Sequence, residues 1–470
     1  MQATLEQVKV LEFTKNSQDD FKISAFAGAG KTSTLRMLAK EFNKLSFLYL
    51  AFNKDIKKEA EESFTRNVYC TTYHALARRA MQIDNSNYKN KLNLKLKTSE
   101  IVKILKVDQQ DFCNPYSVLP IIKKTLANFK ISSSFDFHES HIDLESIIEL
   151  TGVPTEQSRI ATFVYKMAKK YWQYETDCEK EFPMDHDTYL KMWHLADPKI
   201  DVDAIFFDEA QDANAVILDI VRMQNCRKIF VGDTHQKIYS WRGAVNAMES
   251  LKIPELSLTQ SFRFGVNIAK FANIILKKKG EKRELLGFDK IQSKLGSIDE
   301  TKKFTHLCRT NAELVMQAIF YASQNKKIYL MGTEAELFNR CKQAYLLFAN
   351  KKDLLPINCE FKTYKSWNDF VAIAKGNREN NILVKVVLKF QEQLPQRIDE
   401  IKKYLANEKD ANVILCSAHK SKGLQWEQVR IGSDFSFKIE EEQNLFYVAS
   451  TRAIEVLDIS NCENILKEII

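Results

Sequence analysis

The stretch FKISAFAGAGKTSTLRMLAKEF, residues 21–42, decides the fold. Phe21, Ile23 and Ala25 alternate with polar residues, a pattern that is typical of a short strand. The small residues 27–30 then turn the chain, and the apolar residues that follow Lys31 recur at helical spacing. Strand, glycine turn and helix form the setting in which a phosphate-binding loop is expected.

The residues of this loop supply the groups that hold a chain of phosphates. Small residues let backbone N–H groups converge on an anion, and the helix N-terminus adds the positive end of its dipole. Lys31 adds a charge for the β- and γ-phosphates, and the Thr32 hydroxyl can ligate Mg²⁺. Ala25 stands where the strict pattern has glycine, and the alternative is a glycine turn that binds nothing. The strand–turn–helix setting favours the phosphate loop.

Composition places the chain among globular proteins with several domains. It has 470 residues, of which 45% are hydrophobic and 28% charged, and this length predicts about three domains. No apolar run approaches the roughly 18 residues of a membrane span, and no signal-peptide pattern is present. We therefore expect a cytoplasmic or nucleoid-associated protein with no membrane partner. Nine cysteines without a C-x-x-C pair predict reduced thiols, and the net charge of +8 is only weak support for a polyanionic partner.

The remaining pattern predicts an α/β fold. A continuous apolar run at 47–52 and strand patterns at 203–207 and 228–231 indicate parallel strands around the phosphate loop. A second α/β unit begins near Leu258, and each unit is interrupted by a mostly helical segment. The predicted division is 1–80 and 196–257 for the first lobe, 81–195 for its helical insertion, 258–355 and 406–470 for the second lobe, and 356–405 for its small insertion.

A pair of carboxylates follows one of the predicted strands. Asp208 and Glu209 come directly after the run at 203–207, where the strand end faces the ligand side of an open sheet. An ATPase needs Mg²⁺ held opposite the phosphate loop and a base for the attacking water. We expect Asp208 to reach the metal and Glu209 to face the water.

Nine short sequence strings along the chain occur in the order of a known family. They are AFAGAGKTST (25–34), LAFNKDIKKEA (50–60), TTYHALA (71–77), DEAQD (208–212), VGDTHQKIYSWRGA (231–244), LTQSFRF (258–264), LCRTNAEL (307–314), SAHKSKGLQW (417–426) and EEQNLFYVASTRA (441–453). With these strings the chain resembles a superfamily 1 DNA helicase of the UvrD/Rep/PcrA type, and most of all the F-box DNA helicase branch, although without an F-box. The resemblance implies two RecA-like parallel-sheet lobes with ATP in their cleft and single-stranded DNA across their tops.

The resemblance implies roles for individual residues of the ATP site. Gln7 would read the adenine and Phe262 would stack on it; the alternatives are an exposed polar helix residue and a core phenylalanine. Gln236 would sense the γ-phosphate, and Arg263 and Arg452 would be two arginine fingers, which need to arrive where negative charge develops. The implied sets are Gln7, Ala27, Gly28, Ala29, Gly30, Lys31, Thr32, Ser33, Phe262 and Gln425 for ATP, Thr32 and Asp208 for Mg²⁺, and Glu209, Gln236, Arg263 and Arg452 for catalysis.

A second implied set contacts DNA. Aromatic stacking suits a motor that reads no sequence, because every base has a π-face. Phe52, Tyr239 and Trp241 would stack on bases, and Thr72, His74, Arg242 and His419 would hold the DNA backbone or connect it to the ATP site. For Trp241 the alternative is an ordinary core position.

The expected activity is ATP-driven translocation on single-stranded DNA and unwinding at junctions with duplex, with 3′-to-5′ polarity, in repair, recombination control or defence. One alternative is a translocase that strips proteins from DNA. Another is an ATP-gated DNA-binding sensor subunit that controls a partner such as a nuclease. The sequence does not identify a protein partner, such as a nuclease or a recombination factor.

Several features depart from the family pattern. Gln425 stands where the family usually has glutamate at the ribose, and the second insertion is small. The residues after Arg452 leave no room for a strand-separating hairpin, so weak unwinding by a monomer is expected; Tyr171 and Trp172 are candidate substitutes, with core positions as the alternative. Asp136, His138, Glu139 and His141 could be drawn as a metal site, but a solvated loop is the favoured interpretation.

Overall fold

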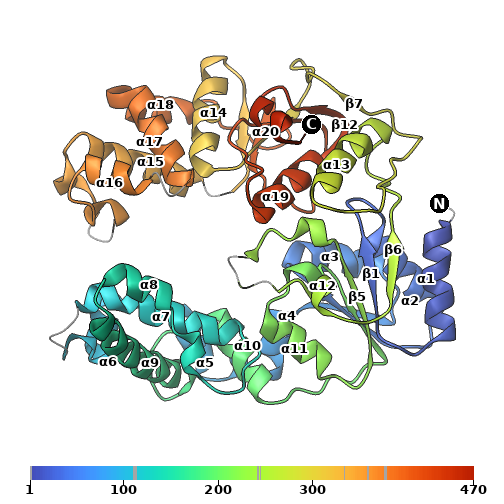
Figure 1. The fold of residues 1–470 in the computed structure, drawn as a ribbon, viewed down its shortest axis with the longest axis horizontal. Helices are drawn as coiled ribbons and strands as arrows, with labels where there is room; N and C mark the ends of the chain where they lie inside the picture. Colours follow the sequence, from blue (N-terminus) through green and yellow to red (C-terminus); the bar gives the residue numbers. More distant parts are fainter. Residues whose placement is uncertain are drawn as a thin grey trace. The chain divides into compact units, whose positions relative to one another are not determined.

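A computed structural model describes residues 3–109, 114–240, 243, 245–332, 334–356, 359–374 and 378–469. By its contacts the chain divides into two compact units (Figure 1). The first comprises Met1–Ala25 and Lys31–Leu258, and the second comprises Phe26–Gly30 and Thr259–Ile470. Each unit is built on its own parallel sheet, so the predicted α/β class with two parallel-sheet lobes is confirmed.

The first sheet has six strands, and every paired neighbour runs parallel. Strands β1, β2 and β4 are buried along their whole length. This burial explains the continuous apolar sequences of β2 and β4, while in β1 the polar residues Lys22 and Ser24 are buried as well. The order across the sheet is β3 (Val68–Thr72), β2 (Phe47–Ala51), β4 (Ala204–Phe207), β5 (Arg227–Gly232), β1 (Phe21–Ala25) and β6 (Glu255–Leu258).

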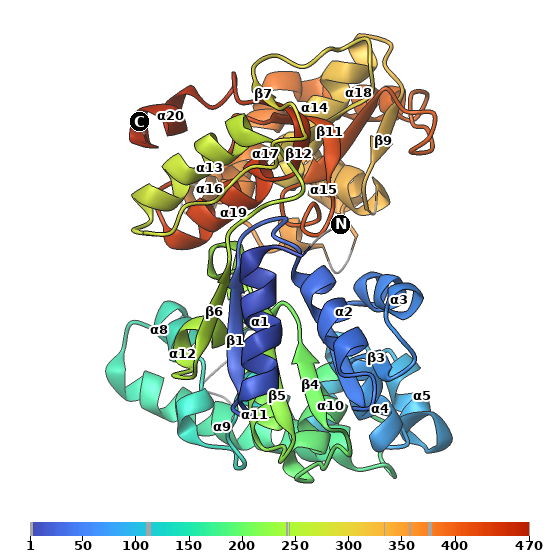
Figure 2. The same cartoon turned by 90° about the vertical axis from the view of Figure 1, so that its right-hand side faces the viewer.

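Helices cover both faces of the first sheet. Helix α1 (Leu5–Asn16) lies in front of β1 in Figure 2, and α2 (Lys31–Glu41) lies in front of the sheet to its right. Helix α3 (Lys54–Ser63) leads into Phe64, which packs on Tyr49 of β2. On the opposite face, Leu48 and Ile205 share a core with the remaining helices of this layer. These are α4 (Tyr73–Ala80), α10 (His186–Leu195), α11 (Ala215–Arg222) and α12 (Ala247–Ser250).

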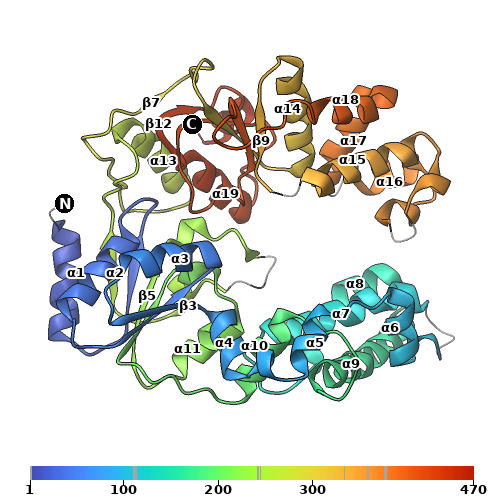
Figure 3. The same ribbon diagram turned by 180° about the vertical axis from the view of Figure 1, so that it is seen from behind.

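In the segment between α4 and α10, the described residues form helices joined by loops and include no strand (Figure 3). Its helices enclose a core of their own. Tyr171 is buried in that core against Phe182, and the partly buried Trp172 packs edge-on against Phe129, so both are core side chains and not an exposed wedge. The helices are α5 (Tyr88–Asn93), α6 (Thr98–Leu105), α7 (Pro115–Ile131), α8 (Leu144–Leu150) and α9 (Pro154–Thr176).

The second sheet also has six strands, all paired in parallel. Two neighbouring interior strands, β8 and β10, are buried along their whole length. The order is β7 (Lys294–Leu295), β12 (Ala453–Asp458), β11 (Trp426–Ile431), β8 (Phe304–Cys308), β10 (Val413–Ser417) and β9 (Ile328–Leu330).

The helices of the second unit pack as two groups. One group, α14 to α18, shares a single core with β8, β9 and β10, and the domain limits given above remain predictions. The members are α14 (Asn311–Ser323), α15 (Glu334–Phe348), α16 (Trp367–Ala374), α17 (Arg378–Phe390) and α18 (Leu394–Ile401). The other group comprises α13 (Val266–Lys278), α19 (Glu440–Ser450) and α20 (Glu463–Ile469). Within the described ranges, no helix combines the length and apolar character of a membrane span.

Candidate active site

The turn between β1 and α2 has the backbone that a phosphate-binding loop requires. Gly28 and Gly30 adopt φ angles of +73° and +76°, the left-handed region that favours glycine. Gly28 also has no room for a side chain, since a Cβ there would lie 2.6 Å from Ser261 Oγ and 2.7 Å from Arg263 Cβ. The N–H of Phe262 donates to the Gly28 carbonyl at 2.9 Å. The loop is therefore fixed by the residues that follow β6.

Lys31, the first residue of α2, is paired with the predicted catalytic base. Its ammonium donates to Oε1 of Glu209, and each side chain is only 14% exposed. Glu209 lies two residues beyond the end of β4 and has a left-handed φ of +52°. The structure therefore brings the loop cation and the strand-end carboxylate together.

Asp208 is buried, and hydrogen bonds reach both of its carboxylate oxygens. The Tyr49 hydroxyl donates to Oδ2 at 2.6 Å, and the N–H of Glu209 donates to Oδ1 at 2.9 Å. Burial raises the pKa of Asp208, and the nearby Lys31 cation acts in the opposite direction. Burial and the charge of Asp208 raise the pKa of Tyr49 well above its usual value, so the hydroxyl keeps the proton that it donates. Tyr49 thereby orients Asp208.

Asp208 and Thr32 form a donor set that suits Mg²⁺, which prefers oxygen ligands. Each carboxylate oxygen accepts more than one bond, so the hydrogen bonds from Tyr49 and Glu209 leave Asp208 able to bind a cation. Thr32 is half-buried at the start of α2, directly after Lys31. The residues present therefore fit the ion that the resemblance implies.

Gln211 links the carboxylate pair to the end of β5. It is fully buried, and its Nε2 donates to Oε2 of Glu209 at 2.5 Å. Its Oε1 accepts from the N–H of Asp233 at 3.1 Å, and Oδ2 of Asp233 accepts from Nε2 of Gln236 at 2.6 Å. The predicted γ-phosphate sensor and the predicted base are thus connected through two residues.

Gln7 is held between α1 and α2. Its Oε1 accepts from the N–H of Thr4 at 3.0 Å, and its Nε2 donates to Oγ1 of Thr34 at 3.1 Å. The side chain is buried, so the alternative of an exposed polar helix residue is wrong. The capping box explains this burial, because the amide closes the first turn of α1.

Arg263, one of the predicted fingers, is positioned within the second unit. Its Nε donates to Oε1 of Gln425 at 2.9 Å, and its Nη1 donates to the carbonyl of Thr451 at 3.2 Å. Gln425, predicted at the ribose, therefore contacts this arginine. The neutral amide of Gln425 accepts the hydrogen bond and leaves the positive charge of Arg263 uncompensated. A glutamate at this position would neutralise that charge.

Arg452, the second predicted finger, is 1% exposed. Its guanidinium donates to the carbonyls of Val448 and Leu424 at 2.8 and 3.2 Å and to the Thr451 hydroxyl at 3.2 Å. Both arginines therefore contact Thr451, one through its carbonyl and the other through its side chain. Burial makes Arg452 part of the core of this region as well as a candidate catalytic group.

Two aromatic residues lie next to the loop within the second unit. The Tyr447 hydroxyl accepts from the N–H of Ala27 at 3.2 Å. Phe262 is half-buried and packs edge-on against Phe288, with the ring centroids 5.4 Å apart. Part of the Phe262 ring is therefore accessible, which the adenine-stacking role requires.

The residues predicted to contact DNA are partly committed to local structure. Phe52 and Tyr239 stack on each other, with ring centroids 5.3 Å apart and an interplanar angle of 19°. Thr72 caps α4 by accepting from the N–H of Ala75, and His74 Nε2 lies 3.0 Å from Asp187 Oδ1. His419 is half-buried, and burial lowers its pKa to about 4. Trp241 and Arg242 lie outside the described residues.

The segment 136–141 differs from the solvated loop that was expected. Asp136, His138 and Glu139 are exposed, but His141 is buried. Its ring packs against Phe129 and Phe137, and its Nε2 lies 3.2 Å from the hydroxyls of Ser132 and Ser134. Phe129, which lies outside the segment, and Phe137 of the segment itself cover the His141 ring, and this packing accounts for the difference. His141 therefore helps to hold this loop.

Three residues of this site were not assigned from the sequence. Tyr49 and Gln211 orient the two carboxylates, and Asp233 connects Gln211 with Gln236. A signal for Tyr49 was available, since it is the only residue with a side-chain hydrogen-bond donor in the run 47–52. Gln211 lies within the DEAQD string, but its position two residues after Glu209 does not predict the hydrogen bond between the two side chains.

The fold and this site together define the class: an α/β protein with a phosphate loop after its first strand and an acidic pair after a neighbouring strand. Residues 6–252 match the UvrD/REP helicase N-terminal domain, and the chain belongs to this family. It is 33% identical over 96% of its length to F-box DNA helicase protein 1 of Schizosaccharomyces pombe, and it covers 56% of that protein. It is 32% identical to F-box DNA helicase 1 of Gallus gallus, with 97% of this chain and 49% of that protein covered.

A probable DNA helicase II homolog of Mycoplasma genitalium is 28% identical over 34% of the chain and 26% of its own length. The chain spans about half the length of the F-box relatives that it matches.

Proposed function

We propose that this chain is a DNA-dependent ATPase that moves along single-stranded DNA in the 3′-to-5′ direction and separates duplex strands. The observation that carries the proposal is the pair of Lys31 and Glu209 next to the oriented carboxylate of Asp208. These groups lie at the carboxyl ends of parallel strands, where α/β sheets bind ligands. Membership of the UvrD/REP family and the names of the DNA helicase relatives support the same activity.

In this proposal, the N–H groups of residues 27–30 and the Lys31 ammonium bind the phosphates of ATP. Thr32 and Asp208 would hold Mg²⁺, which when bound offsets phosphate charge and polarises the γ-phosphoryl group. Glu209 accepts a proton from the attacking water at a carboxylate oxygen. Gln211 keeps Glu209 in one orientation, so the base does not have to be ordered during the reaction.

Arg263 and Arg452 act on the charge that develops on the γ-phosphoryl oxygens. Thr451 gives the two arginines a common contact, and Gln236 reports the γ-phosphate to Glu209 through Asp233 and Gln211. The adenine contacts assigned to Gln7 and Phe262, and a ribose contact from Gln425, belong to the same proposal. To contact the ribose, the Gln425 side chain would have to give up its hydrogen bond with Arg263.

Single-stranded DNA and its junctions with duplex are the proposed partners. Phe52 and Tyr239 offer stacking surfaces for bases, and Thr72, His74 and His419 lie at polar positions suited to the backbone. Trp241 and Arg242 complete the proposed contact set. The pathway, whether repair, recombination control or defence, and a nuclease or recombination factor as protein partner are parts of the proposal that need their own tests.

Strand displacement tests the proposal most directly. Duplexes with either a 3′ or a 5′ single-stranded tail are incubated with ATP and Mg²⁺, with the Glu209→Gln variant as the catalytic control. We expect displacement from the 3′-tailed duplex and DNA-stimulated ATP hydrolysis without any partner protein. Displacement from the 5′ tail alone would reverse the polarity. A lack of hydrolysis until a partner is added would favour the sensor subunit.

A further inference from the structure

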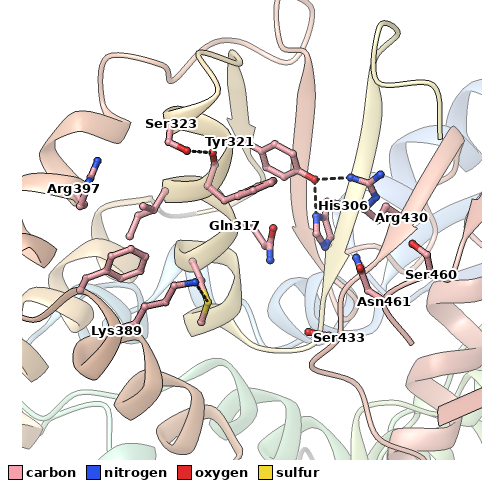
Figure 4. A pocket seen from close by; sticks show the side chains of 14 residues that line it. His306, Gln317, Tyr321, Ser323, Lys389, Arg397, Arg430, Ser433, Ser460 and Asn461 are labelled. Atoms are coloured by element: carbon pink, nitrogen blue, oxygen red, sulfur yellow. Dashed lines mark hydrogen bonds between the residues drawn. The ribbon is translucent and has the colours of Figure 1, made fainter. Parts of the chain in front are cut away.

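The second unit contains a pocket of about 540 Å³ that none of the roles above uses (Figure 4). It lies beside α14 and includes loop residues that directly follow strands of the second sheet, such as Ser433 and Ser460. Six polar side chains on its wall matter for the argument. They are Gln317 and Tyr321 of α14, His306 of β8, Arg430 of β11, Lys389 of α17 and Arg397 of α18.

One end of the pocket is cationic. Lysine and arginine line it, and none of the described residues on its wall is aspartate or glutamate. Within the described chain, Lys389 has no carboxylate partner; its ammonium lies 3.9 Å from the Met316 sulfur. Arg397 contacts Glu400 of its own helix at 3.4 Å. Figure 4 shows Lys389 and Arg397 at the same end, away from His306, and this end favours an anion.

The pocket wall also carries apolar side chains. Met316, Ile319, Phe320 and Phe390 line the pocket together with the Gln317 amide. At the other end, Arg430 is balanced by Asp458 and Glu300, each at 2.9 Å. Its charge is therefore already satisfied, and this end is suited to a neutral hydrogen-bonding group.

His306 leaves one nitrogen at this polar end without a partner. The side chain is 2% exposed, and its Nε2 makes no hydrogen bond to any residue that the structure describes. The Tyr321 hydroxyl accepts from Arg430 Nη1 at 3.4 Å and lies 3.0 Å from Nδ1 of His306. When the Tyr321 hydroxyl donates its hydrogen bond to Nδ1, that nitrogen is the acceptor of the neutral ring. The single N–H of the ring is then on Nε2, which is a donor. Burial lowers the pKa of His306 to about 3, so the ring is neutral at physiological pH.

We propose that this pocket binds a small organic anion, with its negative group at Lys389 and Arg397, its apolar body along α14, and an acceptor atom at His306. Buried donors are nearly always satisfied in native proteins, and a ligand acceptor would satisfy Nε2. Pockets of a few hundred cubic ångströms with an apolar wall and a few convergent polar groups are typical of small-molecule sites. The proposal does not depend on ATP hydrolysis.

A suitable probe is 4-nitrophenyl phosphate, which has an anion, a ring and a distal acceptor. Its binding is measured by calorimetry on the Lys31→Ala chain, so that the phosphate loop contributes less. Inorganic phosphate and phenyl phosphate serve as partial ligands and should bind more weakly. Lys389→Ala should weaken probe binding about tenfold, the loss of one charge-assisted contact. Lys385→Ala, an exposed lysine on the same helix that does not line the pocket, should leave it unchanged.

His306→Phe should abolish the advantage of the nitrophenyl over the phenyl probe. If that variant does not fold, a crystal structure of the Lys31→Ala chain with the probe gives the same information. Three results would overturn the proposal: no binding of the probe, an equal loss with Lys389→Ala and Lys385→Ala, or displacement of the probe by single-stranded DNA. The binding experiment requires no ATP turnover, so its failure is separate from a failure of the proposed ATPase.

Discussion

Lys31 donates to one oxygen of Glu209 while Gln211 donates to the other, at 2.5 Å. The predicted base is therefore held at both oxygens by two different elements of the first unit. In the proposed mechanism, a phosphate would compete with Glu209 for the Lys31 ammonium, and an exchange would free one carboxylate oxygen to accept a proton. ATP binding would then be coupled to activation of the proposed base.

Glu209→Gln should bind ATP but hydrolyse it slowly. The amide keeps the shape of the side chain and removes the base, and general-base catalysis contributes about 10²–10⁴ in rate. Single-turnover hydrolysis with single-stranded DNA, together with a nucleotide-binding assay, measures the two effects. Lys31→Ala is the contrasting variant, because it should weaken both binding and turnover. Wild-type turnover in Glu209→Gln would show that another group is the base.

Tyr49→Phe should weaken the response to Mg²⁺. The change removes the 2.6 Å hydrogen bond to Asp208, and loss of such a supporting contact typically costs about 10–100-fold in metal affinity or activity. The Mg²⁺ dependence of hydrolysis and direct Mn²⁺ binding by electron paramagnetic resonance give two readouts. Tyr69→Phe, an exposed tyrosine on β3, is the matched control. Equal metal affinity in the two variants would limit Tyr49 to a packing role.

Interior strands of the first sheet could be predicted from the sequence, but three edge strands could not. β2 and β4 are buried along their length, and burial on both faces favours the apolar residues that predicted these strands. β3, β6 and β7 lie at sheet edges and are partly exposed. An edge strand has fewer buried positions, so its sequence resembles a loop.

The candidate site was predictable where one short string carries the chemistry. Lys31 and Glu209 each belong to such a string, and the structure places them together. Tyr49 contacts Asp208, which is 159 residues away, and Gln211 contacts Glu209, which is 2 residues away. Both contacts depend on side-chain directions that the spacing in the sequence does not reveal. The bond between Arg263 and Gln425 spans 162 residues and was likewise invisible in the sequence.

Arg263→Ala should lower kcat and leave ATP binding largely intact. An arginine finger contributes about 10³–10⁵ in rate in comparable phosphoryl-transfer sites. Arg452→Ala should lower kcat as well, and it should also reduce the free energy of unfolding. It would remove the Arg452 donor from the Leu424 carbonyl, at about 1–3 kcal/mol for a buried group left unpaired, whereas the Val448 carbonyl would keep its hydrogen bond from Thr451. Kinetics and chemical denaturation separate the two effects, and a loss of ATP affinity with unchanged kcat would contradict the finger role.

Glu313→Gln should stabilise the protein at high pH. Burial raises the pKa of Glu313 to about 7, opposed by a hydrogen bond from Gln317. A raised folded-state pKa means that the folded state binds the proton more tightly, so stability is lost as pH rises from about 4.5 through 7. The variant should match the wild type near pH 5 and exceed it at pH 8 by up to about 3 kcal/mol. Denaturation at both values tests this, with exposed Glu463→Gln as the control; the same difference at both pH values would contradict it.

Phe52→Ala should reduce stimulation by DNA while basal ATP hydrolysis remains. Phe52 and Tyr239 stack with ring centroids 5.3 Å apart, and both rings are half-buried. Loss of a stacked base costs about 1–3 kcal/mol, which titration of single-stranded DNA would measure as weaker binding. Tyr69→Ala removes an exposed aromatic side chain from β3 of the same unit and is the control.

Tyr239→Ala and the double variant complete this test. Because the two rings contact each other, the effects of the single changes on DNA affinity should differ from additivity by at least about 0.5 kcal/mol. Circular dichroism establishes that each variant is folded before DNA is added. If basal and DNA-stimulated rates fall by the same factor, the pair supports only the fold. A second outcome is that DNA stimulation falls while basal hydrolysis is unchanged, and that one single variant already shows most of the loss seen in the double variant. In that case the two rings act as one stacking surface for DNA.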